Sequence, residues 1–302
     1  MKKITQYLSL VKFSHTIFAM PFAILGFFMG VMHVQQDETS LSGFRKVSAY
    51  FSDHWTIFSY IVLCMVFARS AAMAFNRYLD REFDAKNPRT AIREIPRGII
   101  SPASALRFTI INSILFMGSA WMINTTCFLL SPIALMVILG YSYTKRFTAL
   151  CHIILGLGLS LAPVGAFIAV TGQVNTSIIL LSAAVIGWVS GFDIIYALQD
   201  DSFDASQGLY SIPSYLGRKN AINLSRILHL ITAILLLGVG YVAGFHWIYF
   251  IGLFIYTSLL GYQQSIVKEN DLSRVNIAFM TANGIASIIF ALFTITELIY
   301  FG

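Results

Sequence analysis

Charged residues are scarce in this chain of 302 amino acids: they make up 11% of it, and only 14 residues are Asp or Glu. Hydrophobic residues make up 57%. A soluble globular domain carries roughly twice this share of charge, so the composition excludes a water-soluble protein. Because the apolar runs are long enough to cross a bilayer, we predict an all-α, polytopic membrane protein.

Cysteine and histidine are equally rare, and neither shows the spacing of a metal site or a disulfide framework. The three cysteines, which we interpret as small core residues, are Cys64, Cys127 and Cys151. The six histidines are His15, His33, His54, His152, His229 and His246. No basic stretch interleaved with aromatic residues occurs either, so the net charge of +6 does not indicate nucleic-acid binding. The first apolar run lacks a small-residue cleavage site, and we expect it to remain as a membrane helix.

Apolar windows of about 20 residues predict a bundle of about nine transmembrane helices. The windows lie near residues 14–33, 55–75, 103–121, 124–140, 151–170, 176–197, 223–243, 246–265 and 275–300. An odd number of spans places the two termini on opposite sides of the membrane. We expect one domain over residues 1–302, with polar loops at 85–102 and 205–222 that cap one end of it.

Basic residues predict the orientation. Of the 20 Lys and Arg residues, 17 fall on one side of the nine-helix arrangement. Arg45 and Lys46 lie on the other side, and Arg69 lies within a span. By the positive-inside rule the N-terminus and both polar loops face the cytoplasm, in a multi-pass protein of the plasma (inner) membrane.

Two acidic clusters 120 residues apart share one spacing, with a polar residue and two aspartates at i, i+4 and i+8. Each cluster ends an apolar run; the residues are Asn76, Asp80 and Asp84 in 76–84, and Tyr196, Asp200 and Asp204 in 196–204. On a helix this spacing puts all three side chains on one face. Crowded carboxylates repel one another unless a cation lies between them. Two facing pairs therefore predict a site for divalent cations that carry a phosphorylated ligand. Asp201 lies off this face, and we do not expect it to be a ligand.

Two ionisable residues continue these polar faces into the membrane. Arg69 lies seven residues before Asn76, and Asp193 lies seven residues before Asp200. Because a charge within the bilayer usually faces a cavity or a partner, we expect both to line the site and to interact with each other, directly or through water or a bound acceptor. A purely structural ion pair is the alternative.

These residues resemble a known family. The segments Asn76–Thr90 and Asp193–Asp204, together with 12–16, 69–71 and 141–148, resemble the signatures of the UbiA superfamily of intramembrane aromatic prenyltransferases. The resemblance covers about residues 10 to 220 and implies a helical bundle around a central cavity, with the acidic motifs at its cytoplasmic end. It also implies transfer of a polyprenyl group from its diphosphate to an aromatic ring.

The resemblance further implies roles for individual residues. Asp80 and Asp84 are expected to hold one Mg²⁺ and Asp200 and Asp204 another, with Asn76 as a further oxygen ligand. Diphosphate oxygens would be bound by basic side chains, namely Arg81, Lys145 and Arg146, and Arg89 is a further substrate-binding candidate. An allylic cation would be stabilised by the rings of tyrosines, namely Tyr141, Tyr143 and Tyr196. For His15, contact with substrate and a hydrogen bond at a helix start remain alternatives.

The acceptor is the least determined part of the prediction. Basic residues near the site suit an aromatic carboxylate, and the family resemblance favours 4-hydroxybenzoate. However, the segment 93–98 reads Arg-Glu-Ile-Pro-Arg-Gly, where many 4-hydroxybenzoate enzymes have Arg-Pro-Leu. This departure resembles a subgroup that prenylates a naphthoate in menaquinone biosynthesis. A secondary transporter is the alternative of another class, although transporters place ion sites near the bilayer midplane and these carboxylates lie at helix ends. Prenyl chain length and oligomeric state are not readable from the sequence.

Overall fold

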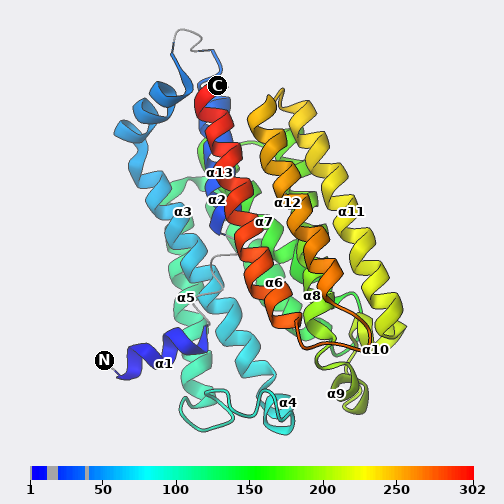
Figure 1. Ribbon diagram of the computed structural model, residues 1–302. Coiled ribbons are helices and arrows are strands. Elements are labelled where there is room, and N and C mark those ends of the chain that lie inside the picture. Colours follow the sequence, from blue (N-terminus) through cyan, green and yellow to red (C-terminus); the bar gives the residue numbers. More distant parts are fainter. Residues whose placement is uncertain (1, 12–19, 38–40) are drawn as a thin grey trace.

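The computed structural model describes residues 2–11, 20–37 and 41–302, and within these ranges the regular elements are helices. Figure 1 shows the long helices running side by side as a bundle, with three short helices, α4 (Arg81–Lys86), α9 (Asp201–Ser206) and α10 (Ile212–Leu216), at one end. The N-terminal helix α1 (Lys2–Leu10) lies at this same end, and the C-terminus lies at the other (Figure 1). The termini therefore lie at opposite ends, as the odd span count predicts.

Seven helices are long and apolar enough to cross a membrane. They are α3 (Gly43–Leu79), α5 (Pro102–Ile123), α6 (Thr125–Thr144), α7 (Cys151–Thr171), α8 (Thr176–Ala197), α11 (Arg218–Val242) and the continuous stretch Ile277–Phe301, which comprises η2 (Ile277–Ala282) and α13 (Asn283–Phe301). The described part of the first span, α2 (Met20–Val34), is shorter, and α12 (Trp247–Ile266) is not among the seven. The protein is thus an all-α, multi-pass membrane protein, whereas the predicted number of nine spans is not confirmed.

Helix α3 is longer than the sequence predicts. It begins at Gly43, twelve residues before the expected start, and bends at His54, whose φ of −129° and ψ of 23° are not helical. Figure 1 shows the chain changing direction there. The predicted segment 55–75 is therefore the straight part beyond the bend.

Helix ends follow from local sequence. Asn124 and Asn175 accept hydrogen bonds from the backbone N–H groups of Cys127 and Ile178 and so cap the N-termini of α6 and α8. Gly172, with φ of 70°, ends α7 in the left-handed conformation that glycine adopts without strain. Short connections therefore bring α5 against α6 and α7 against α8 as neighbours.

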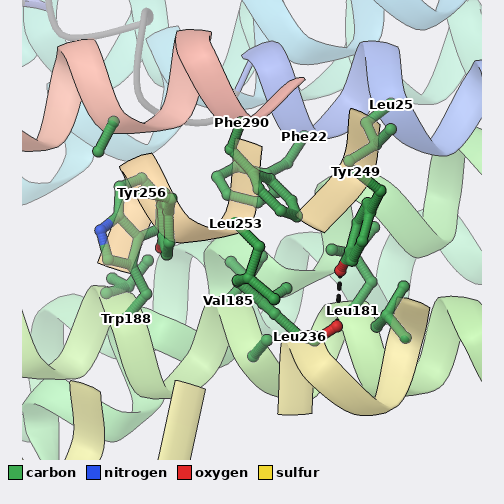
Figure 2. Packing of buried hydrophobic residues seen from close by; sticks show 14 of the residues in the cluster. Phe22, Leu25, Leu181, Val185, Trp188, Leu236, Tyr249, Leu253, Tyr256 and Phe290 are labelled. Carbon is green, nitrogen blue, oxygen red and sulfur yellow. Dashed lines mark hydrogen bonds between the residues drawn. The ribbon is translucent and has the colours of Figure 1, made fainter. Parts of the chain in front are cut away.

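The main hydrophobic core fills one part of the bundle, among α2, α8, α11, α12 and α13. Figure 2 shows the rings of Phe22, Trp188, Tyr256 and Phe290 meeting there. Among these buried aromatic residues, Trp188 Nε1 donates a hydrogen bond to Asn283 Oδ1 at 3.0 Å. This packed side of the bundle includes α8, whose C-terminal end leads into the second acidic motif at Asp200 and Asp204.

Helices α2 and α7 approach each other closely. A Cβ atom on Gly26 would lie 2.2 Å from the carbonyl oxygen of Pro163, so only glycine fits at this position. This contact holds α7 against the packed part of the bundle, while the other side of α7 faces α6 and a cavity described below.

Candidate active site

The four aspartates lie at breaks between a long helix and a short one. Helix α3 ends at Leu79, and Asp80 separates it from α4, which contains Asp84. Asp200 in the same way precedes α9, which contains Asp204. Each acidic cluster therefore spans a break between two helices and does not lie on one continuous helix. The carboxylate pairs nevertheless stay one turn apart, because the N–H of Asp84 donates to the carbonyl of Asp80 and that of Asp204 to the carbonyl of Asp200, each at 2.7 Å.

Lys145 joins the two motifs. Its Nζ lies 3.9 Å from Oδ2 of Asp80 and 4.0 Å from Oδ1 of Asp204, and both carboxylate side chains are less than a tenth exposed. Arg146 Nη2 adds a contact to Oδ1 of Asp80 at 3.3 Å, and Asn76 Nδ2 donates to Oδ2 of Asp80 at 3.3 Å. The two acidic clusters therefore face each other across Lys145, as their matched spacing predicts.

The other two aspartates, Asp200 and Asp84, are bound by residues of the loop that follows α4. Arg89 forms a two-pronged ion pair with Asp200, and its Nε lies 2.9 Å from Oδ1. Asn87 Nδ2 donates to the same oxygen at 3.0 Å, and Arg89 Nη1 contacts the hydroxyl of Tyr196 at 3.0 Å. Residues 85–102 thus reach across from the first motif to the second.

Arg93 forms the matching contact within the first motif, with Nη1 at 2.6 Å from Oδ1 of Asp84. The sequence analysis did not assign a role to Arg93 or to Asn87. Their position directly after the first acidic motif is the signal that could have identified them, because a loop that caps a carboxylate site must supply positive charge or hydrogen-bond donors.

Burial affects the aspartates unequally. For Asp80 and Asp204, removal of the carboxylate from water raises the pKa, and nearby Lys145 opposes the rise without cancelling it. For Asp200, burial also acts to raise the pKa, but the hydrogen bonds from Arg89 and Asn87 outweigh it and the pKa is lowered. Burial therefore disfavours the ionised form of Asp80 and Asp204, whereas hydrogen bonds favour the ionised form of Asp200.

The donor set fits a hard divalent cation. Oδ2 of Asp84 is buried and has no hydrogen-bond partner within the described ranges, so it is an oxygen ligand left available. No three His, Cys, Asp or Glu side chains of the described residues gather into one metal-binding group. The carboxylates instead form two pairs, and an ion at either pair would need further oxygen ligands from a bound molecule or water.

An apolar cavity lies among α3, α5, α6 and α7. Its empty volume is about 1130 Å³ including its open side, and aliphatic residues such as Ile61, Leu130 and Leu159 line it. Arg69 and Tyr141 are among the few polar residues in its lining. Since α3 carries Arg69 and ends at Asp80, and α6 carries Tyr141 and ends at Lys145, the polar residues of the cavity lie toward the acidic clusters. Such a space accommodates a long hydrocarbon chain with a charged head.

The structure contradicts a direct ion pair between Arg69 and Asp193, whereas an interaction through water or a bound acceptor stays a prediction. Among the described residues the two form no ion pair, and Asp193 is instead bound by His152, with Nδ1 at 2.7 Å from Oδ2. Arg69 Nε is buried and has no hydrogen-bond partner in the described part of the chain. Arg69 and Tyr141 line the cavity, and Asp193 lies close enough to Tyr141 for its charge to act on the hydroxyl. The direct pair fails because α7 places a histidine beside Asp193.

Three other predicted residues, and Asp201, which was not expected to be a ligand, lie away from the carboxylates or outside the description. Arg81 donates to the carbonyl of Tyr78 at 2.8 Å and pairs with Glu82, so its guanidinium points away from the four aspartates. Tyr143 is 45% exposed, contacts Arg146 and does not line the cavity. His15 lies outside the described residues. Asp201 pairs with Arg218, away from the four aspartates.

The fold and the site together define a class: an integral membrane enzyme whose apolar cavity ends at a paired-carboxylate site for a charged, oxygen-rich group. Comparison with known proteins agrees. The UbiA prenyltransferase family matches residues 39–285. The chain is 30% identical to the 4-hydroxybenzoate octaprenyltransferase of Tolumonas auensis, over 74% of this chain and 78% of that protein. It is 31% identical to the enzyme of the same name from Klebsiella pneumoniae, over 74% and 77%.

Solved structures show the same fold. An apo UbiA homologue from Aeropyrum pernix K1 is 30% identical, with a TM-score of 0.79 over 94% of this chain and 98% of that one. A UbiA homologue from Archaeoglobus fulgidus, solved with DMAPP and Mg²⁺, is 22% identical, with a TM-score of 0.68 over 97% and 99%. The chain belongs to the UbiA prenyltransferase family. It is a membrane-embedded prenyltransferase, and the resemblance noted in its sequence is confirmed.

Proposed function

We propose that the protein transfers a polyprenyl group from a polyprenyl diphosphate to a ring carbon of an aromatic acid in quinone biosynthesis, with Mg²⁺ as cofactor. The observation that supports this proposal most directly is the junction of two features: an apolar cavity and, at its polar end, two carboxylate pairs that face each other across Lys145. We extend the proposal to one catalytic domain over residues 1–302.

The carboxylates would hold Mg²⁺ in two pairs, Asp80 with Asp84 and Asp200 with Asp204. A bound Mg²⁺ supplies charge neutralisation, which makes diphosphate a better leaving group. Lys145 is already located between the two motifs and would contact the diphosphate oxygens, and Arg146 and Arg89 flank it. These cations would stabilise the negative charge that develops as the carbon–oxygen bond of the prenyl diphosphate breaks.

The acceptor would bind where Arg69, Tyr141 and Asp193 converge. Arg69 has an unused, buried N–H group, which suits the carboxylate of an aromatic acid. Asp193 carries the opposite charge and suits the phenolic hydroxyl at the other end of the ring. The ring carbon beside that hydroxyl then forms a bond to the prenyl carbon, and the proton on that ring carbon leaves. The ring of Tyr196, which Arg89 and Phe279 hold in place, supplies an aromatic face near the departing diphosphate.

We take 4-hydroxybenzoate as the leading acceptor, supported by the names of the two relatives above. A naphthoate acceptor is the second candidate, and the segment 93–98 favours it. In this segment Arg93 contacts Asp84 and Glu94 accepts a hydrogen bond from Ser9 on α1, so the departure from Arg-Pro-Leu changes how the loop is attached to the site.

We further propose that the protein is located in the plasma (inner) membrane with this site on the cytoplasmic side. The distribution of basic residues supports this orientation, because Lys86, Lys145 and Lys219 lie at the end of the bundle that carries the acidic motifs, whereas Arg45 lies near the start of α3 at the other end.

The test is an assay of the purified protein with a polyprenyl diphosphate and either 4-hydroxybenzoate or a dihydroxynaphthoate. We expect magnesium-dependent release of diphosphate together with a prenylated acid, and the preferred acceptor decides between the two candidates. Asp200→Asn and Asp201→Asn form a matched pair for this assay, since the two aspartates are adjacent but only Asp200 faces the site. Absence of turnover with both acceptors, or equal loss in both variants, contradicts the proposal.

A further inference from the structure

His152 is a buried histidine, only 3% exposed, at the first turn of α7. It contacts two other elements. Nδ1 lies 2.7 Å from Oδ2 of Asp193 on α8, and Nε2 lies 3.2 Å from the backbone nitrogen of Ile212, the first residue of α10. The carbonyl of His152 also accepts a hydrogen bond from Ser190 Oγ at 3.2 Å, which fixes the start of α7 against α8. The imidazole therefore connects the cap loop to Asp193.

These contacts determine the tautomer of the ring. The backbone N–H of Ile212 can only donate, so Nε2 must carry a lone pair and accept. The ring proton then resides on Nδ1, where it is donated to Asp193 Oδ2. The imidazole is neutral in this arrangement, and the hydrogen bond that Nδ1–H donates to Oδ2 favours the carboxylate form of Asp193.

The hydrogen bond leaves Asp193 with one oxygen held and one available. Its side chain is 23% exposed, and Oδ1 has no hydrogen-bond partner within the residues that the structure describes. The charge of Asp193 reaches the hydroxyl of Tyr141, on which Arg69 also acts. Asp193 therefore lies in the same region as Tyr141 and Arg69, and the hydrogen bond from His152 fixes the orientation of its carboxylate.

We infer that His152 is a positioning residue for the aromatic acceptor, acting by holding Asp193 ionised and oriented toward the acceptor's phenolic hydroxyl. This inference rests on the proposed function, since it assigns Asp193 to the hydroxyl end of the acceptor. It also gives the cap loop a role, because the Ile212 N–H selects the tautomer that makes the orientation possible.

The same stretch of cap loop contacts the diphosphate side of the site. The N–H of Tyr210, two residues before Ile212, donates to the carbonyl of Lys145 at 2.7 Å. One short segment is thus fixed both to the residue that joins the two aspartate motifs and to the residue that orients Asp193. The position of this cap segment therefore affects both the diphosphate side of the site, through Lys145, and the acceptor side, through His152.

Two substitutions separate the two hydrogen bonds of His152. In His152→Asn the side-chain amide nitrogen can take the place of Nδ1 and still donate to Asp193. In His152→Gln the amide oxygen can take the place of Nε2 and accept from Ile212, but no donor remains at the Nδ1 position. We expect His152→Gln to raise the KM for the aromatic acid about tenfold, the typical effect of one hydrogen bond to a charged group. His152→Asn should recover most of that loss, and the KM for the prenyl diphosphate should change little in both.

Each outcome has a defined meaning. A wild-type acceptor KM in His152→Gln, or equal effects of Asn and Gln on both substrates, overturns the inference and leaves a structural role for His152. If the wild-type protein itself prenylates no aromatic acid, the proposed function fails instead.

A second measurement does not depend on activity or on the folding of variants. Nitrogen NMR of the wild-type protein labelled at histidine distinguishes a protonated ring nitrogen from one with a lone pair. We expect a neutral ring with the proton on Nδ1 at His152. A proton on Nε2, or on both nitrogens, contradicts the inference.

Discussion

Asp80→Asn and Asp200→Asn should both remove most of the activity while affecting stability in different ways. The pKa of Asp80 is raised by burial, so at neutral pH its ionised form is less stable in the folded protein than in water. A neutral Asn relieves that cost, and we expect Asp80→Asn to be as stable as the wild type or more stable when Mg²⁺ is absent. The pKa of Asp200 is lowered, so its ionised form stabilises the fold. Its loss should destabilise the protein.

The contacts of Asp200 set the size of the effect. In Asp200→Asn the amide oxygen can still accept from Arg89 Nε and from Asn87, which lie 2.9 and 3.0 Å from Oδ1. The second prong of the Arg89 pair is lost, because an amide NH₂ would face the guanidinium. A hydrogen bond between charged groups contributes about 1.5–3 kcal/mol. Since the Arg89 side chain is 33% exposed and solvent screens the pair, we expect a loss of about 1–2 kcal/mol. Activity should fall by roughly 10²–10³-fold in either variant.

The assay combines diphosphate release at saturating Mg²⁺ with thermal unfolding in detergent without Mg²⁺. Asp201→Asn is the control, because Asp201 pairs with Arg218 and does not face the other aspartates. Wild-type turnover of Asp80→Asn or Asp200→Asn would remove these residues from the metal site. Equal destabilisation by the two substitutions would refute the electrostatic difference between them.

Three further outcomes are expected. Lys145→Met should lower the unfolding temperature without Mg²⁺, because Asp80 and Asp204 then repel each other. Added Mg²⁺ should raise the unfolding temperature of this variant by more than that of the wild type. An equal response to Mg²⁺ in both proteins contradicts this. The acid limb of the pH–activity profile should lie above the ordinary aspartate pKa of 3.8, because burial raises the pKa of Asp80 and Asp204. Since the protonated acids do not bind metal, a higher Mg²⁺ concentration should shift this limb to lower pH. In a background without native cysteines, an impermeant thiol reagent on intact cells should label Arg45→Cys and not Lys86→Cys, and the reverse pattern would invert the topology.

The sequence predicts the helical membrane class and the pairing of the two acidic motifs, because composition and spacing are local properties. Apolar runs determine where helices cross the membrane, and matched i, i+4 and i+8 positions bring carboxylates to one end of two helices. The family resemblance of the motifs is confirmed by the match over residues 39–285.

The partners of individual charges were harder to predict. Arg69 and Asp193 have equivalent positions in the two motifs, which suggested a mutual pair, but the choice of partner depends on how α7 packs against α8. That packing places His152 beside Asp193, and no periodicity in the sequence encodes it. The helix breaks at Asp80 and Asp200 were not predicted for a related reason: the N–H groups of Asp84 and Asp204 still donate to the carbonyls of Asp80 and Asp200, four residues earlier, so the spacing within each motif stays helical although the long helix ends.

The position of Lys145 implies that the protein carries its own counter-ion between turnovers. The ammonium group lies between carboxylates of both motifs, so the folded chain does not depend on a metal to keep them together. A magnesium ion that arrives alone would have to displace this ammonium and leave it without a partner. If the ion arrives together with diphosphate, the ammonium group of Lys145 would contact the phosphate oxygens in place of the carboxylates. With the proposed metal ligands, metal affinity would therefore be coupled to the presence of diphosphate, and Lys145 would return to its carboxylates once diphosphate has left.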